Sequence, residues 1–274
     1  MQFTISHISL INKLRVLFCV VLLEWLLFIF SGVSFSFLHG NQFFSLEVDP
    51  VSWFFYLLHI PQFIITHQWI SVSLDILIVL LLLLFIRNPF INQIAILLFI
   101  LLLIFYITLM SHLIHRNYQF GFFLVFIPFF FHKEINRKYA FTATRYFLLF
   151  FYVSAAFLKL TNGALSDPAH FSHLASGQFT PYFLEGNTGL RTSVNLYLVS
   201  HHAFGYMLFI ISVILEFVTV VGFFSRRFDK WIALFLLLFH FANWFLMDIA
   251  PIGQIAFISL LFLSREPGLK EIKT

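Results

Sequence analysis

Long apolar runs dominate this chain of 274 residues and decide what it can fold into. A helix of about 20 apolar residues crosses the ~30 Å core of a membrane, because it satisfies its own backbone hydrogen bonds. Runs of roughly 15–25 mainly apolar residues recur along the sequence. They fall near residues 14–38, 71–86, 91–113, 118–131, 141–160, 204–224, 231–248 and 251–264. We therefore predict an all-α, polytopic transmembrane bundle of about eight spans.

The composition supports a membrane protein over a soluble one. Hydrophobic residues make up 61% of the chain and charged residues only 10%, against roughly 25% charged residues in a soluble domain. The single cysteine, Cys19, excludes an intrachain disulfide and a CxxC redox or zinc pair. The net charge of +4 is assigned to cytoplasmic loops and not to a nucleic-acid surface. We expect one integral-membrane domain over residues 1–274, with the lipid bilayer as its main partner.

Basic residues sort to one side of the predicted bundle when the N-terminus is placed in the cytoplasm. Of the 16 lysines and arginines, all but Arg116, Lys159 and Arg191 then lie at cytoplasmic ends of spans. This distribution satisfies the positive-inside rule at every short loop. Both termini are then cytoplasmic, and the two long connections, near 39–70 and 161–203, lie outside.

Lys159 is the most informative ionisable residue, because it ends the apolar run 145–160. An ionisable side chain inside or at the edge of a span is costly and is therefore a candidate functional group. A lysine that loses its hydration can serve as a base. Alternatively, Lys159 extends from the end of its helix to the membrane interface. The residues alone leave both interpretations open.

Other polar residues inside the predicted spans are Glu24, Asp75, Glu216 and His240. In lipid such groups turn inward and pair with one another. We predict that Glu216 and His240 face the bundle interior, where they can be partners across the sixth and seventh spans. A structural pair and a chemical role are equal alternatives for these two residues.

Histidine pairs at helical spacing raise the alternative of a metal site. His112 and His115 are three residues apart, as are His170 and His173, and two histidines on one helix face can bind a metal. These pairs lie in separate loops, so interfacial histidines without a metal are the preferred interpretation. No metal site is assigned, and a histidine-ligated metalloenzyme stays an alternative.

Three stretches resemble one membrane-protein family. They are RYFLLFFYVSAAFLKLTNGAL at 145–165, HLIHRNYQFGFFLVFIPFF at 112–130 and FHFANWFLMDIAPIGQIAFISLLF at 239–262. Together with WISVSLDILIVLLLLLF near 69–85, they look like the membrane core of vitamin K-dependent gamma-carboxylases. That core is shared with a wider bacterial family, the horizontally transferred transmembrane (HTTM) domain. The resemblance implies a multi-pass protein of the cell membrane, the inner membrane in a bacterium.

The resemblance also implies roles for particular residues. In the carboxylase, a lysine at the membrane edge is the base that works with vitamin K hydroquinone, and Lys159 in AAFLKL matches it. His240 and His115 resemble the family's histidines, which implies that they bond a quinone oxygen or orient a partner. The implied cofactor is a reduced quinone. The carboxylase's large lumenal region has no counterpart here, so we do not expect carboxylation of protein glutamates.

The connection 161–203 supplies candidate ligand-binding residues. Phe179, Tyr182 and Phe183, with Phe171, are predicted to wall an outward-opening cavity beside Lys159, which suits a flat or isoprenoid ligand. The first function hypothesis is therefore a membrane enzyme, of lyase or oxidoreductase type, that acts on a quinone or lipid-like substrate. The second is a non-catalytic membrane component of a peptide-toxin maturation or export system, with a peptide or membrane-protein partner.

Overall fold

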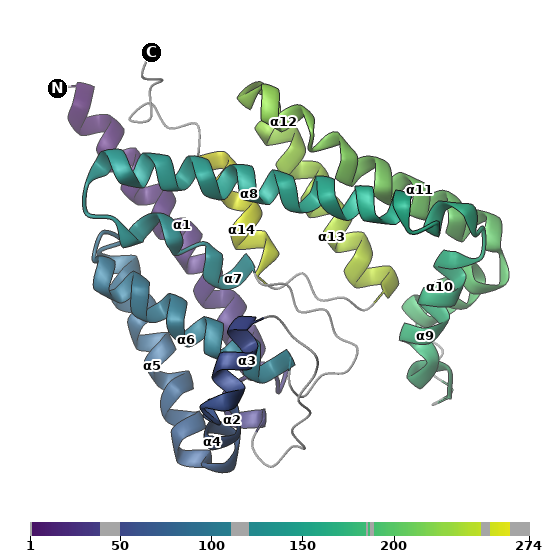
Figure 1. The fold of residues 1–274 in the computed structure, drawn as a ribbon, viewed down its shortest axis with the longest axis horizontal. Helices are drawn as coiled ribbons and strands as arrows, with labels where there is room; N and C mark the ends of the chain where they lie inside the picture. Colours follow the sequence, from purple (N-terminus) through teal and green to yellow (C-terminus); the bar gives the residue numbers. More distant parts are fainter. Residues whose placement is uncertain are drawn as a thin grey trace. The chain divides into compact units, whose positions relative to one another are not determined.

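The structure is a computed structural model that describes residues 2–38, 50–110, 121–184, 186, 189–247 and 253–263. All regular structure among these residues is helical (Figure 1). The chain divides into two compact units, here called unit 1 (Met1–Thr144 with Ile252–Thr274) and unit 2 (Arg145–Pro251). The expectation of one domain over the whole chain stays a prediction.

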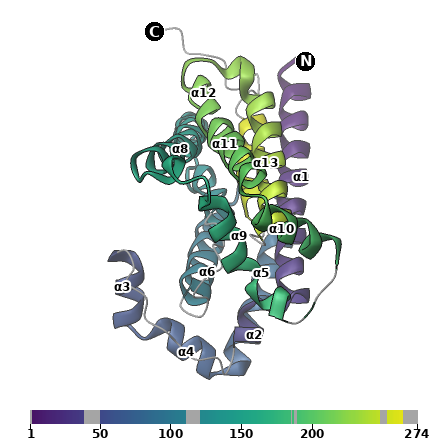
Figure 2. The ribbon, with the colours of Figure 1, turned by 90° about the vertical axis from the view of Figure 1, so that its right-hand side faces the viewer.

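Unit 1 is built around the long first helix. Its helices are α1 (Gln2–Phe30), α2 (Phe35–Leu38), α3 (Pro50–Leu57), α4 (Ile60–Thr66), α5 (Gln68–Arg87), α6 (Asn92–Met110), α7 (Gly121–Leu124), the 3-10 helix η1 (Ile127–Phe130), the first part of α8 (Glu134–Thr161) and α14 (Gln254–Leu263). Helix α1 packs against α5 and α14, and the short α2 and α4 pack at one end of α5 (Figures 1 and 2). Buried aromatic rings fill the core, with Phe18 4.6 Å from Phe85 and 5.5 Å from Phe126 between ring centroids.

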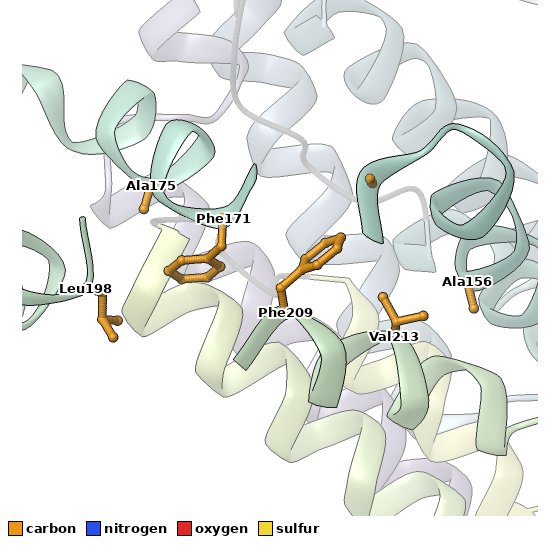
Figure 3. Close-up of a cluster of buried hydrophobic side chains, with 7 residues drawn as sticks. Ala156, Phe171, Ala175, Leu198, Phe209 and Val213 are labelled. Carbon is orange, nitrogen blue, oxygen red and sulfur yellow. The ribbon is translucent and has the colours of Figure 1, made fainter. Parts of the chain in front are cut away.

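Unit 2 contains the rest of α8 and the helices that follow it. They are η2 (Ala164–Ser166), α9 (His170–Leu184), α10 (Leu190–Ser200), α11 (His202–Val218), α12 (Val221–Phe224), η3 (Arg226–Phe228) and α13 (Asp229–Met247). Helices α11 and α13 lie side by side in both views (Figures 1 and 2). A buried apolar cluster joins Ala156 of α8 to Phe171 of α9 and Phe209 of α11 (Figure 3). This cluster packs the helices that carry the candidate site.

Six helical segments among the described residues are long and apolar enough to cross a membrane, so the chain is a multi-pass integral membrane protein. They are Ile11–Leu38, Gln68–Arg87, Asn92–Leu109, Glu134–Thr161, His202–Phe224 and Arg226–Leu246. They correspond to six of the eight predicted spans. In the other two, near 118–131 and 251–264, the described helices α7, η1 and α14 have 4, 4 and 10 residues. The count of eight and the cytoplasmic termini stay predictions.

A break in the helical structure separates the predicted spans 71–86 and 91–113. Helix α5 ends at Arg87, and Asn88 takes an extended backbone conformation with φ −141° and ψ 90°. Pro89 follows, and a residue before proline is disfavoured in the helical region because its backbone collides with the proline ring. The boundary between the predicted spans 231–248 and 251–264 lies outside the described residues.

The two acidic residues in the spans of unit 1 lie within α1 and α5, and their carboxylates face the starts of other helices. The Asp75 carboxylate accepts hydrogen bonds from the Ser34 hydroxyl at 2.8 Å and from the N–H groups of Phe35 and Ser36 at 3.2 and 3.0 Å. Helix starts leave such N–H groups without intrahelical partners, so Asp75 caps α2.

Glu24 has a similar position at the start of α14. Its buried carboxylate faces the backbone N–H groups of Gly253 and Ala256, without completing a hydrogen bond of full geometry to a described residue. The positive end of a helix dipole favours a negative group there. Asp75 therefore has a structural role as a helix cap, whereas both buried Glu24 oxygens have no full hydrogen bond to a described residue.

Candidate functional site

A polar stripe runs along one side of α8 inside unit 2. Arg145, Tyr152 and Lys159 are spaced by seven residues, which is close to two helical turns, so their side chains leave the helix in nearly the same direction. Seven residues rise by about 10.5 Å, so the stripe covers about 21 Å of a ~30 Å membrane core. Each of these three side chains is bonded to a residue on another helix, either α11 or α13.

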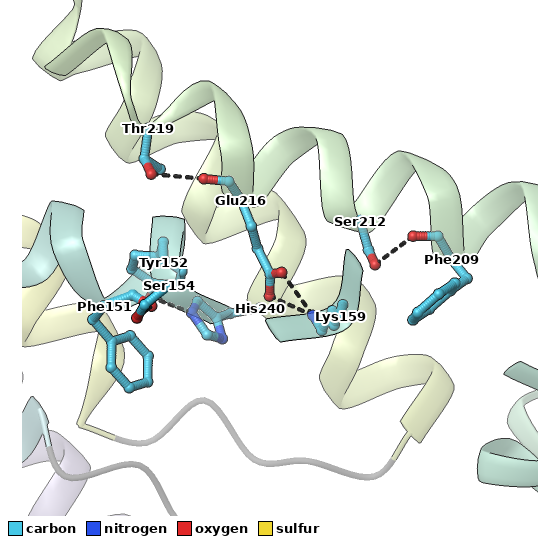
Figure 4. Close-up of polar contacts among 9 residues, drawn as sticks. All are labelled: Phe151, Tyr152, Ser154, Lys159, Phe209, Ser212, Glu216, Thr219 and His240. Atoms are coloured by element: carbon cyan, nitrogen blue, oxygen red, sulfur yellow. Dashed lines mark hydrogen bonds and ion pairs between the residues drawn. The ribbon is translucent and has the colours of Figure 1, made fainter. Parts of the chain in front are cut away.

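Lys159 forms an ion pair with Glu216 of α11. Its Nζ atom lies 2.7 Å from both carboxylate oxygens (Figure 4). The Glu216 side chain is 5% exposed and that of Lys159 is 31% exposed. The Lys159 Nζ also lies 5.8 Å from the centroid of the Phe239 ring. Lys159 therefore turns toward a buried carboxylate, and its amine is only partly accessible.

Tyr152 and His240 form a second pair beside the first. The Tyr152 hydroxyl lies 2.5 Å from His240 Nε2, and both residues are almost fully buried. In Figure 4, His240 lies between Tyr152 and Lys159. Lys159 interacts electrostatically with His240, and Glu216 with Tyr152. We call these four residues the Lys159 cluster.

The structure corrects the expected pairing between Glu216 and His240. The prediction that both residues face the interior is confirmed, since both are buried. Their partners differ from the expected ones: Glu216 binds Lys159, and His240 binds Tyr152. All four side chains come from three helices of unit 2, so the pairing depends on how each helix is rotated about its own axis.

Nearby hydroxyl groups bond their own helices. Thr219 donates to the Glu216 carbonyl at 2.6 Å, Ser212 donates to the Phe209 carbonyl at 2.7 Å, and Ser154 donates to the Phe151 carbonyl at 2.9 Å (Figure 4). Serine and threonine commonly bond the carbonyl three or four residues earlier in this way. These hydroxyl groups therefore donate to backbone carbonyls and not to the Glu216 carboxylate, which is bound by Lys159.

Arg145 forms the third pair of the stripe, with Asp229 at the start of α13. Its Nε and Nη2 atoms donate to the two Asp229 oxygens at 3.0 and 2.6 Å, and Nη2 also donates to the Gly222 carbonyl at 2.7 Å. Both side chains are fully buried. A two-pronged contact of this kind fixes geometry as well as charge, so it ties α8 to α12 and to the start of α13.

The residues predicted to bind a ligand are only partly described. Phe179 is buried and lies 6.2 Å from Phe183 and 5.3 Å from the Arg191 guanidinium. The Tyr182 side chain lies outside the described part of the chain, and Phe171 belongs to the apolar cluster with Ala156. The cavity that these rings are expected to wall stays a prediction.

Of the two candidate catalytic histidines, His240 and His115, the structure describes only His240. His240 lies in the Lys159 cluster, whereas His115 and its neighbour His112 lie outside the described residues. The His170 ring packs 5.0 Å from Phe209. No group of three His, Cys, Asp or Glu side chains that could hold a metal ion occurs in the described part of the chain.

Sequence reasoning missed Tyr152 and the pairing of Arg145 with Asp229. The available signal is the seven-residue spacing of Arg145, Tyr152 and Lys159 in one apolar run, which predicts a single polar face on an otherwise apolar helix. Their partners carry no such signal, because they lie far away in the sequence.

Comparisons with protein-family models, with curated proteins and with solved structures find no match. The function is therefore argued from the chemistry of the Lys159 cluster.

Proposed function

We propose that this protein is a membrane enzyme in which Lys159 acts as a base on an apolar substrate of the quinone or lipid class. The proposal adopts the resemblance to the HTTM domain and to the membrane core of the vitamin K-dependent gamma-carboxylases, with a reduced quinone as the co-substrate. The observation that carries it is the Lys159–Glu216 ion pair, which is held by two 2.7 Å contacts in a chain with several membrane spans.

A charged pair inside a membrane protein is expensive, because both groups lose their hydration. A lysine needed only as an anchor can extend to water with its charge hydrated. Lys159 instead keeps about two thirds of its side chain covered, against a carboxylate that is almost completely covered. This arrangement suits a lysine that exchanges a proton with a ligand, since Glu216 stabilises the ammonium that forms when the amine takes the proton.

The surroundings of Lys159 support an apolar substrate. Its neighbours Phe157 and Leu158 on α8 are 57% and 56% exposed, and Leu160 is also exposed. In a helix that crosses a membrane, such side chains face lipid. The partly exposed amine therefore lies at the border of an apolar surface, where a ligand dissolved in the bilayer arrives without crossing water.

The proposed topology has eight spans and two cytoplasmic termini, in the inner membrane of a bacterium. It rests on the distribution of basic residues, of which 13 of the 16 then lie on the cytoplasmic side. This topology puts Lys159 in the outer half of the bilayer. Cysteine labelling that finds residues 133–138 outside the cell contradicts it.

The test uses menadiol, a reduced naphthoquinone, with the purified protein in lipid nanodiscs. Proton removal from a menadiol hydroxyl by Lys159 precedes oxidation by O₂, which gives menadione and hydrogen peroxide. We expect the wild-type protein to accelerate this oxidation. Lys159→Met removes the amine and keeps the stem, and it should lower the acceleration by about 10²–10⁴-fold, the usual worth of general-base catalysis.

The variant Lys159→Arg tests whether Lys159 acts as a base or only supplies a positive charge. A guanidinium cannot give up its proton near neutral pH, so this variant should also lose the acceleration. Lys230→Met is the matched control, because Lys230 is an exposed lysine at the start of α13. Full acceleration in Lys159→Arg rejects the base role and favours the alternative, in which the pair only ties α8 to α11 in a non-catalytic membrane component.

A further inference from the structure

An uncharged stretch of unit 1 leads into the spanning helix α5. Residues 50–74 contain no Lys, Arg, Asp or Glu, and they form α3, α4 and the first turns of α5. A soluble domain carries roughly 25% charged residues, so this stretch does not have the composition of a surface that faces water. Six of its large side chains are more than half exposed, and we call them the α3–α4 surface: Trp53, Phe54, Leu57, Leu58, Phe63 and Trp69.

The two helices that carry most of this surface are too short to cross a membrane. Helix α3 has 8 residues and α4 has 7, which corresponds to lengths of about 12 and 10 Å against a ~30 Å core. Between them, His59 has φ 53°, in the left-handed region, and a right-handed helix does not continue through such a residue. The stretch therefore stays at one face of the membrane until α5 begins.

The α3–α4 surface is continuous with the lipid-facing side of α5. Helix α4 packs against α2 and α5 at one end of α5 (Figure 2), and α5 is one of the segments of spanning length. Trp69 in the first turn of α5, and Ile76 and Leu80 further along it, are all more than half exposed. Their spacing of seven and four residues puts them on one side of the helix. Tryptophan is enriched where a membrane meets water, so the surface begins where the lipid-facing side of a span ends.

The end of α4 has hydrogen-bond partners within the protein. The last carbonyls of a helix have no partner in the helix itself. The Phe63 carbonyl accepts a hydrogen bond from His67 Nδ1 at 2.8 Å, and the Ile64 carbonyl accepts one from the Ser71 hydroxyl at 2.8 Å. In lipid such carbonyls must be satisfied by the protein, because no water reaches them. These two side-chain contacts therefore suit a helix end that is immersed in lipid.

We propose that the α3–α4 surface is immersed in one leaflet of the bilayer, at the boundary between the phospholipid headgroups and the acyl chains. The apolar rings of Trp53 and Phe63 contact acyl chains there, while the exposed imidazoles of His59 and His67 lie at the level of the headgroups. Such an element buries its apolar face about 5–10 Å into that boundary. It adds a second kind of membrane contact to the spans and fixes the depth at which α5 begins. This surface does not depend on the role of Lys159.

The test measures the depth of spin labels in the whole chain, reconstituted in vesicles of phosphatidylcholine and phosphatidylglycerol. Cys19→Ser first removes the only cysteine. Trp53→Cys, Leu57→Cys and Phe63→Cys then each carry one nitroxide, at exposed side chains where a label does not disturb a packed core. Electron paramagnetic resonance compares collisions of the label with O₂, which concentrates in lipid, and with a nickel chelate, which stays in water.

Two further labelled variants give the reference values. Lys133→Cys is the reference for water, because Lys133 is exposed and precedes α8. Leu80→Cys is the reference for the acyl chains, because Leu80 is exposed and lies twelve residues after Gln68, a rise of about 18 Å into a ~30 Å core. We expect the ratio of O₂ to nickel collisions at the three test labels to lie between the two references. They should show fewer nickel collisions than Lys133→Cys and fewer O₂ collisions than Leu80→Cys.

Three results overturn the proposal. Nickel collisions as frequent as in Lys133→Cys mean that the surface faces water. Labels that neither reagent reaches mean that a partner protein or a second copy of the chain covers the surface. A collision ratio equal to that of Leu80→Cys means that the segment enters the centre of the membrane and not its boundary. Each comparison uses variants that elute from size-exclusion chromatography as the Cys19→Ser protein does.

Discussion

The buried Arg145–Asp229 pair should be one of the most costly contacts to break in unit 2. Asp229→Ala leaves the Arg145 guanidinium fully buried without its carboxylate partner, with the Gly222 carbonyl at 2.7 Å and the Tyr146 ring at 5.3 Å still beside it. It removes two charge-assisted hydrogen bonds of 3.0 and 2.6 Å. Removing one partner of a buried pair costs about 3–5 kcal/mol, because the other charge stays behind without compensation. We expect that loss in the free energy of unfolding.

The double variant Arg145→Met with Asp229→Leu provides the sharper comparison. It removes both charges and keeps the volume, and such replacements are often neutral. It should therefore be more stable than Asp229→Ala, in reversible unfolding by SDS in mixed micelles. Lys138→Met is the control, since the partly exposed pair of Lys138 with Glu134 at 3.4 Å should contribute only about 0–1 kcal/mol. An Asp229→Ala variant within about 1 kcal/mol of the wild-type protein refutes the reasoning.

Three further predictions concern packing and capping. Gly205→Ala places a Cβ atom 2.7 Å from the Phe171 ring, so it should lower the free energy of unfolding by about 1–3 kcal/mol, and an unchanged value contradicts the packing. Asp75→Ala removes three hydrogen bonds at the start of α2, two of them from backbone N–H groups, and it should cost about 1–3 kcal/mol in the same assay, whereas Asp75→Asn should cost less. Arg191 bonds the carbonyls of Trp244 and Phe245, and Arg191→Lys should speed hydrogen exchange in the last turn of α13, since an ammonium lacks the fork of donors.

The membrane fold could be predicted from the sequence where the signal is local. Helix α5 follows from an apolar run that ends before Pro89, and six of the expected spans appear as helices of spanning length. The length of an apolar run in the sequence gives the length of the membrane helix. The backbone hydrogen bonds of that helix are all made within the same run. The segments near 118–131 and 251–264 are also apolar, but their described helices are short. Apolarity alone does not distinguish a span from a short buried helix.

The pairing inside the site could not be predicted in the same way. Burial of Glu216 and His240 follows from the cost of exposing polar groups to lipid. The choice of Lys159 for Glu216 and of Tyr152 for His240 depends on the rotation and vertical position of α8 against α11 and α13. Those are properties of the packed unit, and residues 57 and 88 positions apart carry no local signal of them.

The most direct measurement of the central claim is the absorption spectrum of 4-methoxy-1-naphthol bound to the protein in nanodiscs. The probe carries the proton that a base must remove, and its spectrum reports the loss of that proton without any later chemistry. The proposed base predicts a naphtholate band in the wild-type protein and in Lys230→Met, and its loss in Lys159→Met and Lys159→Arg. A bound probe that stays neutral in the wild-type protein, or a naphtholate that survives in Lys159→Met, contradicts the assignment of Lys159 as the base.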